Sequence, residues 1–357
     1  MRRATRRRWG LAAVLGACLL AGLAAPPDVA VAGPSLAALG PDGELAFETS
    51  PFMRRYAYAH PERTATELTA SGAYSPLNQR WEQSGRSGSW RIEEQRYGAE
   101  AVAAGIAGND PQAIDRGLRI LEWGFAQQQP DGGFACDDAF HSTSFFVEAA
   151  ARSILLLDRS RYAASVATRT AAMKSRLLAA AHWMIAPANL VRGSHANEPY
   201  THRRYLVAAA LGLAALIVPD EPVRAVASRF VREGIALQWP DGVNPEKGGH
   251  DSSYQAVGLF FALRYYSLAA TDAERRALWP MLERGIRWER GRVGTDGTVN
   301  AEGNTRTGLG QERGPNGTLK DVSYGTVFRL FYRWSQVAAD SDYAVLAEQV
   351  AAARKRH

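Results

Sequence analysis

One pattern recurs five times along this 357-residue chain: an aromatic residue opens a long apolar run. The five aromatic positions are Tyr97, Phe145, Tyr200, Tyr254 and Tyr324, so successive copies are 48, 55, 54 and 70 residues apart. Between them lie stretches with amphipathic helical spacing, at residues 113–127, 165–184, 222–237 and 272–288. A period of this length with one apolar and one amphipathic segment indicates repeated helical hairpins.

The two helices of each predicted hairpin differ in which of their faces are apolar. The helix that follows the aromatic is apolar nearly all round and should be buried, whereas its partner has one polar face and should lie outside. Alternating β-branched runs typical of strands are nearly absent. With a further helix in residues 51–70, the pattern predicts an all-α fold, an (α/α)5–6 toroid or incomplete barrel. An open solenoid is the alternative, although it would leave one face of the apolar helices wet.

The first 32 residues have the features of an export signal. Five arginines precede an apolar stretch at residues 9–25, and Ala-Val-Ala at residues 30–32 offers a small-residue cleavage site. Residues 5–9, TRRRW, also resemble a twin-arginine signal. We therefore expect a periplasmic or secreted protein with a single catalytic domain at residues 33–357. A lipid anchor at Cys18 is the alternative.

Charge and cysteine content exclude several classes of protein. Without residues 1–32 the chain keeps 37 basic and 35 acidic residues, about +2 net, which is no argument for nucleic-acid binding. Cys136 is then the only cysteine, so an intrachain disulfide is excluded. There is no nucleotide-binding loop, zinc-type Cys/His spacing or nucleophile elbow. We expect no cofactor, no metal, no nucleic-acid partner and no membrane span.

The starts of the apolar helices are candidate site positions. In a toroid these N-termini gather at one end, where their unpaired N–H groups and partial positive charge suit an anionic ligand. The polar residues that should line this end are Glu93, Glu94, Arg96, Asp137, Asp138, His141, Asn197, His250, Asp251 and Asp321. Helix capping alone would explain Ser144, Ser253, Asp251 and Asp321. Histidine is not a preferred cap, so His141 and His250 favour a site, with a solvated loop position as their alternative.

A long polar segment, residues 291–321, precedes the last apolar helix and contains eight glycines. Loops of this length inside a compact domain are usually functional. Asn300, Asn304, Arg306 and Arg313 could contact a carboxylate or sugar hydroxyls. The eight tryptophans that follow residue 32 also suit the binding of sugar rings. A surface loop with incidental arginines is the alternative interpretation.

The stretch GGHDSSYQAVGLFFAL, residues 248–263, resembles the alginate-lyase-like (α/α) toroid polysaccharide lyases. Their motif runs roughly Asn-Asn-His-x-x-x-Tyr/Trp before an apolar helix. His250 and Tyr254 match it, while Gly248 and Gly249 stand where the paired asparagine should be. The resemblance spans about residues 190–330.

This resemblance implies β-elimination in an anionic, uronic-acid-containing polysaccharide. Asparagine, arginine or protonated histidine would neutralise the uronate, a base would remove the C5 proton, and an acid would protonate the leaving oxygen. The implied catalytic residues are His250, Tyr254, Asn197, Arg306 and Tyr324. The implied substrate-binding residues are His141, Tyr200, His202, Asp138, Asp251, Asn304 and Arg313. Under this hypothesis Asp251→Asn should matter little, since an amide caps a helix about as well.

Two other functions fit the same sequence features. The first is a glycoside hydrolase with paired carboxylates drawn from Asp137, Asp138, Asp251, Asp321, Glu93 and Glu94. The second is a non-catalytic glycan-binding protein of the cell envelope, which needs only the aromatic residues and the site at the helix N-termini.

Overall fold

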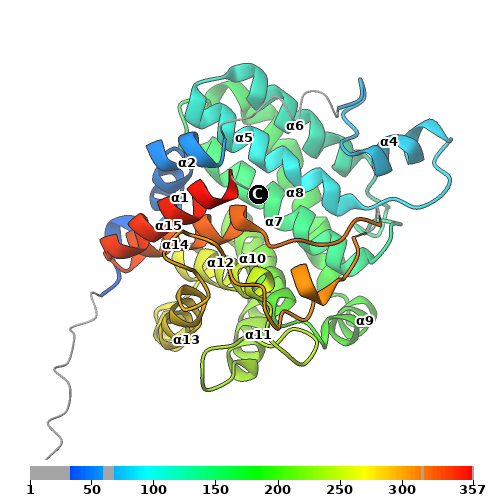
Figure 1. Ribbon diagram of the computed structural model, residues 1–357. Coiled ribbons are helices and arrows are strands. Elements are labelled where there is room, and N and C mark those ends of the chain that lie inside the picture. The colour runs from blue at the N-terminus through cyan, green and yellow to red at the C-terminus, as the bar shows by residue number, and fades with distance from the viewer. Residues whose placement is uncertain (1–32, 59–67, 315–316, 356–357) are drawn as a thin grey trace, which may run out of the picture. The chain divides into compact units, whose positions relative to one another are not determined.

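Helices account for every regular element in the part of the chain that the computed structural model describes, residues 33–58, 68–314 and 317–355 (Figure 1). The predicted all-α class and (α/α) toroid are confirmed. No helix within these ranges combines the length and hydropathy needed to cross a bilayer. The predicted export signal, with Cys18, lies outside the described residues.

The apolar runs form the inner helices. They are α5 (Tyr97–Gly108), α7 (Ala139–Arg159), α10 (Thr201–Ile217), α12 (Ser252–Leu268) and α14 (Tyr324–Val337). Consecutive inner helices pack against one another from α5 to α14. Four begin within two residues of the predicted aromatic, and α7 begins six residues before Phe145. Every residue of α10 from Thr201 to Ala214 is buried, as the lack of a polar face predicts.

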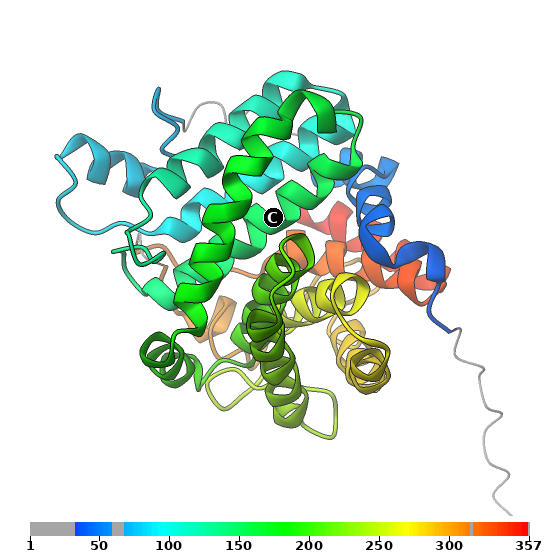
Figure 2. The same ribbon diagram turned by 180° about the vertical axis from the view of Figure 1, so that it is seen from behind.

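The amphipathic segments form the outer helices. They are α6 (Pro111–Ala126), α8 (Ala163–Ile185), α11 (Glu221–Leu237), α13 (Asp272–Arg290) and α15 (Ser341–Arg354). Each packs on the inner helix that precedes it in the chain, and α8 and α11 cover the inner layer in Figure 2. The first four agree with the predicted segments to within about two residues. The sequence pattern does not predict α15, or the shorter α4 (Pro76–Gln83) and α9 (Pro187–Asn197).

The ring is closed by elements other than a sixth hairpin. Helix α1 (Gly40–Glu48) packs against α5, α7 and α12, and α2 (Pro51–Tyr56) packs against α5. Arg329 of α14 donates two hydrogen bonds, of 2.8 and 2.7 Å, to the carboxylate of Glu100 on α5. The helix expected in residues 51–70 is represented by α2, and residues 59–67 of that range lie outside the described part.

Asp-Gly turns hold the loops that lead into the inner helices. Gly132 and Gly242 have φ values of +91° and +98°, which favour glycine. A β-carbon at Gly132 would lie 2.3 Å from the carbonyl oxygen of Ala179 on α8, and one at Gly242 would lie 2.4 Å from that of Arg284 on α13. Each turn therefore docks closely on the next outer helix, which places the following inner helix with its N-terminus at the same end.

Candidate functional site

A cavity of about 550 Å³ lies among the inner helices. Its walls come from α1, α5, α7, α12 and α14, together with the end of the long 291–321 segment. The lining contains five cations against four carboxylates, and also six aromatic rings. These are Arg96, Arg152, Arg264, Lys320 and Arg329; Glu48, Glu100, Glu148 and Asp321; and Tyr58, Tyr97, Phe145, Tyr254, Phe260 and Phe261. Its size and mixed lining are typical of a small-ligand site.

A network of buried ion pairs forms one side of this cavity. Arg264 donates to Glu148 at 2.8 Å and to Glu44 at 3.0 Å, and its Nη2 lies 3.5 Å from a Glu48 oxygen. Arg152 lies 3.3 Å from the same Glu48 oxygen. All of these side chains are buried. Burial by itself would raise the pKa of Glu44, but Arg264 and the neighbouring arginines lower it, so the carboxylate is held ionised.

Arg96 presents a cation to the cavity. Its guanidinium lies over the rings of Tyr97 and Phe145, 4.8 and 4.9 Å from their centroids. The carboxylate that it pairs with, Glu93, is 4.0 Å away, which is too far for a hydrogen bond. Arg96 donates from Nη1 to the carbonyl oxygen of Glu93 at 3.2 Å and from Nη2 to the Tyr97 hydroxyl at 3.4 Å. A guanidinium has five N–H donors, so Arg96 keeps donor capacity for an anionic group of a ligand.

Asp321 differs from the other carboxylates of the cavity. Glu48, Glu100 and Glu148 are each bridged by at least one arginine. Asp321 accepts a hydrogen bond from the backbone N–H of Val322 at 2.7 Å. Within the described ranges no ion pair joins it to a lysine or arginine, and the residue is exposed. It is therefore the lining carboxylate whose oxygens are most accessible to a ligand.

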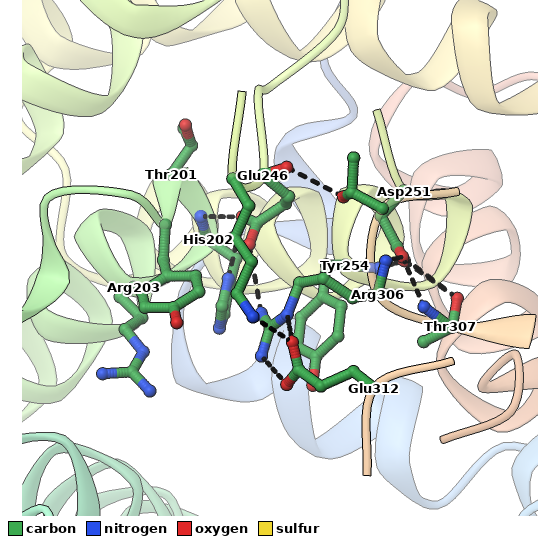
Figure 3. A network of polar contacts seen from close by, with 12 residues as sticks. Thr201, His202, Arg203, Glu246, Asp251, Tyr254, Arg306, Thr307 and Glu312 are labelled. Atoms are coloured by element: carbon green, nitrogen blue, oxygen red, sulfur yellow. Dashed lines mark hydrogen bonds and ion pairs between the residues drawn. The ribbon is translucent and has the colours of Figure 1, made fainter. Parts of the chain in front are cut away.

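A second polar network lies at the N-termini of α10 and α12 (Figure 3). His202 Nδ1 lies 2.8 Å from Oε1 of Glu246, and the backbone N–H of His202 donates to the same oxygen at 2.9 Å. The other oxygen of Glu246 accepts from Arg306 at 3.1 Å. Arg306 also donates to both oxygens of Glu312, at 3.0 and 2.9 Å. This network ties the 291–321 segment to the helix N-termini.

Tyr254 connects this network to the cavity. The guanidinium of Arg306 lies 3.5 Å from the centroid of the Tyr254 ring, and the ring of His202 lies 4.7 Å from it. His141 follows, 6.2 Å from His202 between ring centroids. Burial lowers the pKa of His141, and nearby Arg203 lowers it further. Burial also lowers the pKa of His202 although Glu246 opposes this, so both imidazoles are neutral at pH 7.

Several predicted site residues do come together here. Besides Tyr254, Arg306, His141 and His202, the ring of Tyr200 lies 4.7 Å from the Arg306 guanidinium. Asp138 pairs with Arg203 at 3.2 Å, and buried Asn197 accepts a hydrogen bond from Arg203 at 3.1 Å. Of the five predicted catalytic residues, Tyr254 is the one that lines the cavity.

His250 lies apart from this group. Its Nε2 is 3.1 Å from the carbonyl oxygen of Glu302, and its ring packs against Trp288, 5.4 Å between centroids. Trp288 belongs to the outer helix α13, so His250 faces the outer layer and the 291–321 segment. The paired His250 and Tyr254 of the lyase hypothesis are therefore not assembled at the cavity.

Three other predicted residues have contacts within or around the 291–321 segment instead of lining the cavity. The hydroxyl of Tyr324 accepts from the N–H of Val299 at 3.3 Å. Asn304 is buried and accepts from the N–H of Ser252 at 3.0 Å. Arg313 donates to the carbonyl of Gly317 at 2.6 Å, and both residues are exposed. These contacts position the segment.

Asp251 uses both carboxylate oxygens. Oδ1 caps α12 by accepting from the N–H of Tyr254 at 3.0 Å, while Oδ2 accepts from the N–H groups of Arg306 and Thr307 at 2.9 and 2.8 Å. The expectation from sequence that Asp251→Asn should matter little takes only the helix cap into account. In Asp251→Asn one amide oxygen cannot replace both carboxylate oxygens, so buried N–H groups lose their acceptor.

We therefore expect Asp251→Asn to lower the free energy of unfolding by about 1–3 kcal/mol, measured by urea denaturation. Asp340→Asn is the matched control. Asp340 caps α15 through an exposed hydrogen bond to the N–H of Asp342, which an asparagine can also accept. Equal losses in the two variants would contradict this account of Asp251.

Sequence reasoning missed the acidic partners of these networks. Glu148, Arg152 and Arg264 interrupt apolar runs, a signal that could have identified the buried ion pairs. Glu246 and Glu312 lie in polar loops where nothing in the local sequence separates them from other surface carboxylates.

Comparison with known proteins gives a fold match. No protein-family model and no curated protein matches the sequence. The structure is similar to that of an unsaturated glucuronyl hydrolase from Bacillus sp. GL1, described as responsible for the degradation of glycosaminoglycan. The TM-score is 0.51 at 14% identity, over 86% of this chain and 81% of that one. A UGL variant described with dGlcA-Glc-Rha-Glc has a TM-score of 0.48 at 14% identity, over 87% and 82% of the two chains. The first match supports the toroid fold; the resemblance to the lyases is not confirmed.

Proposed function

We propose that this protein is an exported enzyme that hydrolyses a glycosidic bond in a uronic-acid-containing saccharide. The observation that carries the proposal is the joint presence in one cavity of two charged groups: Asp321, a carboxylate without a bridging cation in the described residues, and Arg96, a cation that no described carboxylate approaches closer than 4.0 Å. The fold neighbour, an unsaturated glucuronyl hydrolase, supports the same class of reaction.

The lining suits an anionic sugar. Five cations against four carboxylates leave the cavity with a positive balance, which favours a negatively charged ligand. The uronate would bind the guanidinium of Arg96. The rings of Tyr97, Phe145 and Tyr254 offer apolar faces to the sugar.

Asp321 is assigned the proton transfers. In its protonated form it donates to the glycosidic oxygen as the bond from that oxygen to the anomeric carbon breaks. Water then adds to the anomeric carbon, and the Asp321 carboxylate takes the proton that this water releases. Glu100 lines the same cavity. Burial would raise its pKa, but Arg329 holds it at about 2, so it stays ionised in a bidentate ion pair with Arg329 that forms a fixed polar wall beside the sugar.

Elimination is the competing reaction, and one observation favours it. The Tyr254 ring, which lines the cavity, lies against the Arg306 guanidinium and the ring of neutral His202, so a hydroxyl-bearing side chain stands beside a cation. The displaced position of His250 weighs against the particular lyase arrangement implied by the sequence motif.

The reaction products separate these alternatives. The protein is incubated with intact hyaluronan or chondroitin, and separately with unsaturated oligosaccharides made from them. We expect new reducing ends without a gain in the ultraviolet absorbance of a C4–C5 double bond. A gain would establish elimination. Absence of new reducing ends from both substrates would reject an enzyme for these saccharides and favour a binding protein.

A further inference from the structure

A second cavity, of about 690 Å³, shares no lining residue with the central one. It is formed by the segment between α4 and η2 (Ile92–Arg96), the Asp-Gly turn before α7, the C-terminal end of α8 and helix α9. Its aromatic lining consists of Trp81, Trp90, Phe134 and Trp183. None of these residues belongs to the site described above.

The indole rings of this cavity are held in place. Trp81 stacks on Trp90 with 4.5 Å between centroids and an interplanar angle of 21°. Trp90 is buried and donates from Nε1 to the carbonyl oxygen of Ala135 at 2.6 Å. Trp183 packs on Gly133 so closely that a β-carbon there would lie 2.3 Å from its Nε1. Fixed rings lose little freedom when a ligand binds to them.

Polar side chains with balanced charge surround these rings. Arg86 and Arg192 are matched by Asp131 and Asp137, and all four residues are exposed. The central cavity differs because the charges of its lining residues sum to a positive value. Rigid aromatic faces with planar hydrogen-bonding groups at their edge suit an uncharged ring that carries hydroxyl groups.

The two cavities are joined by short stretches of chain. Trp90 lines the second cavity and Arg96, at the end of η2, lines the central one. Likewise Ala139, the first residue of α7, lines the second cavity and Phe145 lines the central one. Along α7 the six-residue step from Ala139 to Phe145 spans about 9 Å. A saccharide of a few rings covers that separation.

We infer that the second cavity is a saccharide subsite that binds an uncharged sugar ring, a neutral hexose or an N-acetylated amino sugar, of the chain whose uronate occupies the central cavity. This inference rests on the proposed function. The subsite would increase affinity for longer chains because one molecule would occupy both cavities.

The test measures binding of hyaluronan oligosaccharides of increasing length by calorimetry. All variants are made in an Asp321→Asn background so that the oligosaccharides stay intact. Trp183→Ala removes one aromatic platform, and Arg192→Gln changes the exposed edge without altering the packing. The matched control is Trp239→Ala, since Trp239 is 40% exposed and lies beside the equivalent Asp-Gly turn of another repeat.

We expect affinity to increase with oligosaccharide length. Both cavity variants should bind long oligosaccharides about tenfold more weakly, whereas Trp239→Ala should show the same increase of affinity with length as the parent protein. The second subsite is refuted, and the central site stands, if affinity does not increase with oligosaccharide length. The same holds if Arg192→Gln and a folded Trp183→Ala show the same increase of affinity with length as the parent protein. If no oligosaccharide binds at any length, the subsite and the proposed function both fall.

Discussion

Asp321→Asn is expected to lower the rate of hydrolysis by about 10²–10⁴-fold, the usual effect of losing a positioned proton-transfer group. The amide keeps the shape of the side chain and can still accept the hydrogen bond from Val322. It cannot donate a proton to the leaving oxygen and then take one from water. The measurement is the release of reducing ends under single-turnover conditions, with a thermal melt to show that the variant is folded.

Asp296→Asn serves as the control in the same 291–321 segment. Asp296 accepts a hydrogen bond from the N–H of Thr298 in an exposed turn and does not line the cavity. We expect this variant to retain its hydrolytic rate. If Asp321→Asn also retained its rate, Asp321 would not be the acid.

Arg264→Met is expected to cause the largest loss of stability, about 3–5 kcal/mol in the free energy of unfolding. Arg264 contacts Glu44, Glu48 and Glu148, all of them buried. Methionine fills much of the space of the arginine side chain, but it removes the cation that these three buried carboxylates share. Urea denaturation at neutral pH measures the loss.

The matched control is Arg224→Met. Arg224 pairs with Glu221 within α11, where the two side chains are 43% and 69% exposed and screened by solvent, so we expect no measurable change in stability. Similar losses in both variants would show that the buried network does not contribute in the way proposed.

The loss in Arg264→Met should also depend on pH. The pKa of Glu44 is lowered from 4.5 in the folded protein, so its pairing stabilises the fold above that pH and is lost as the pH falls through the folded-state pKa. The difference in stability between wild type and variant should therefore shrink in acid. A difference that grows as the pH falls would contradict the assignment.

The helical hairpins could be predicted because each depends on residues close together in the sequence. Tyr97 and Tyr324 are the first residues of α5 and α14, as their apolar runs indicate. The Asp-Gly turns at Gly132 and Gly242 likewise reflect local backbone geometry. Repetition of one hairpin then places the inner N-termini together, which is why residues as distant as Arg96 and Asp321 line one cavity.

Which partners each polar side chain contacts depends on the tertiary structure. His250 and Tyr254 are four residues apart, yet the packing of the 291–321 segment places His250 beside Glu302 and Tyr254 beside Arg306. Glu246 contacts Arg306 across 60 residues of sequence. The helical period is a short-range property that a sequence displays directly. Ion pairs between distant loops depend on how those loops pack, because a buried charge is retained only where the fold brings it a partner.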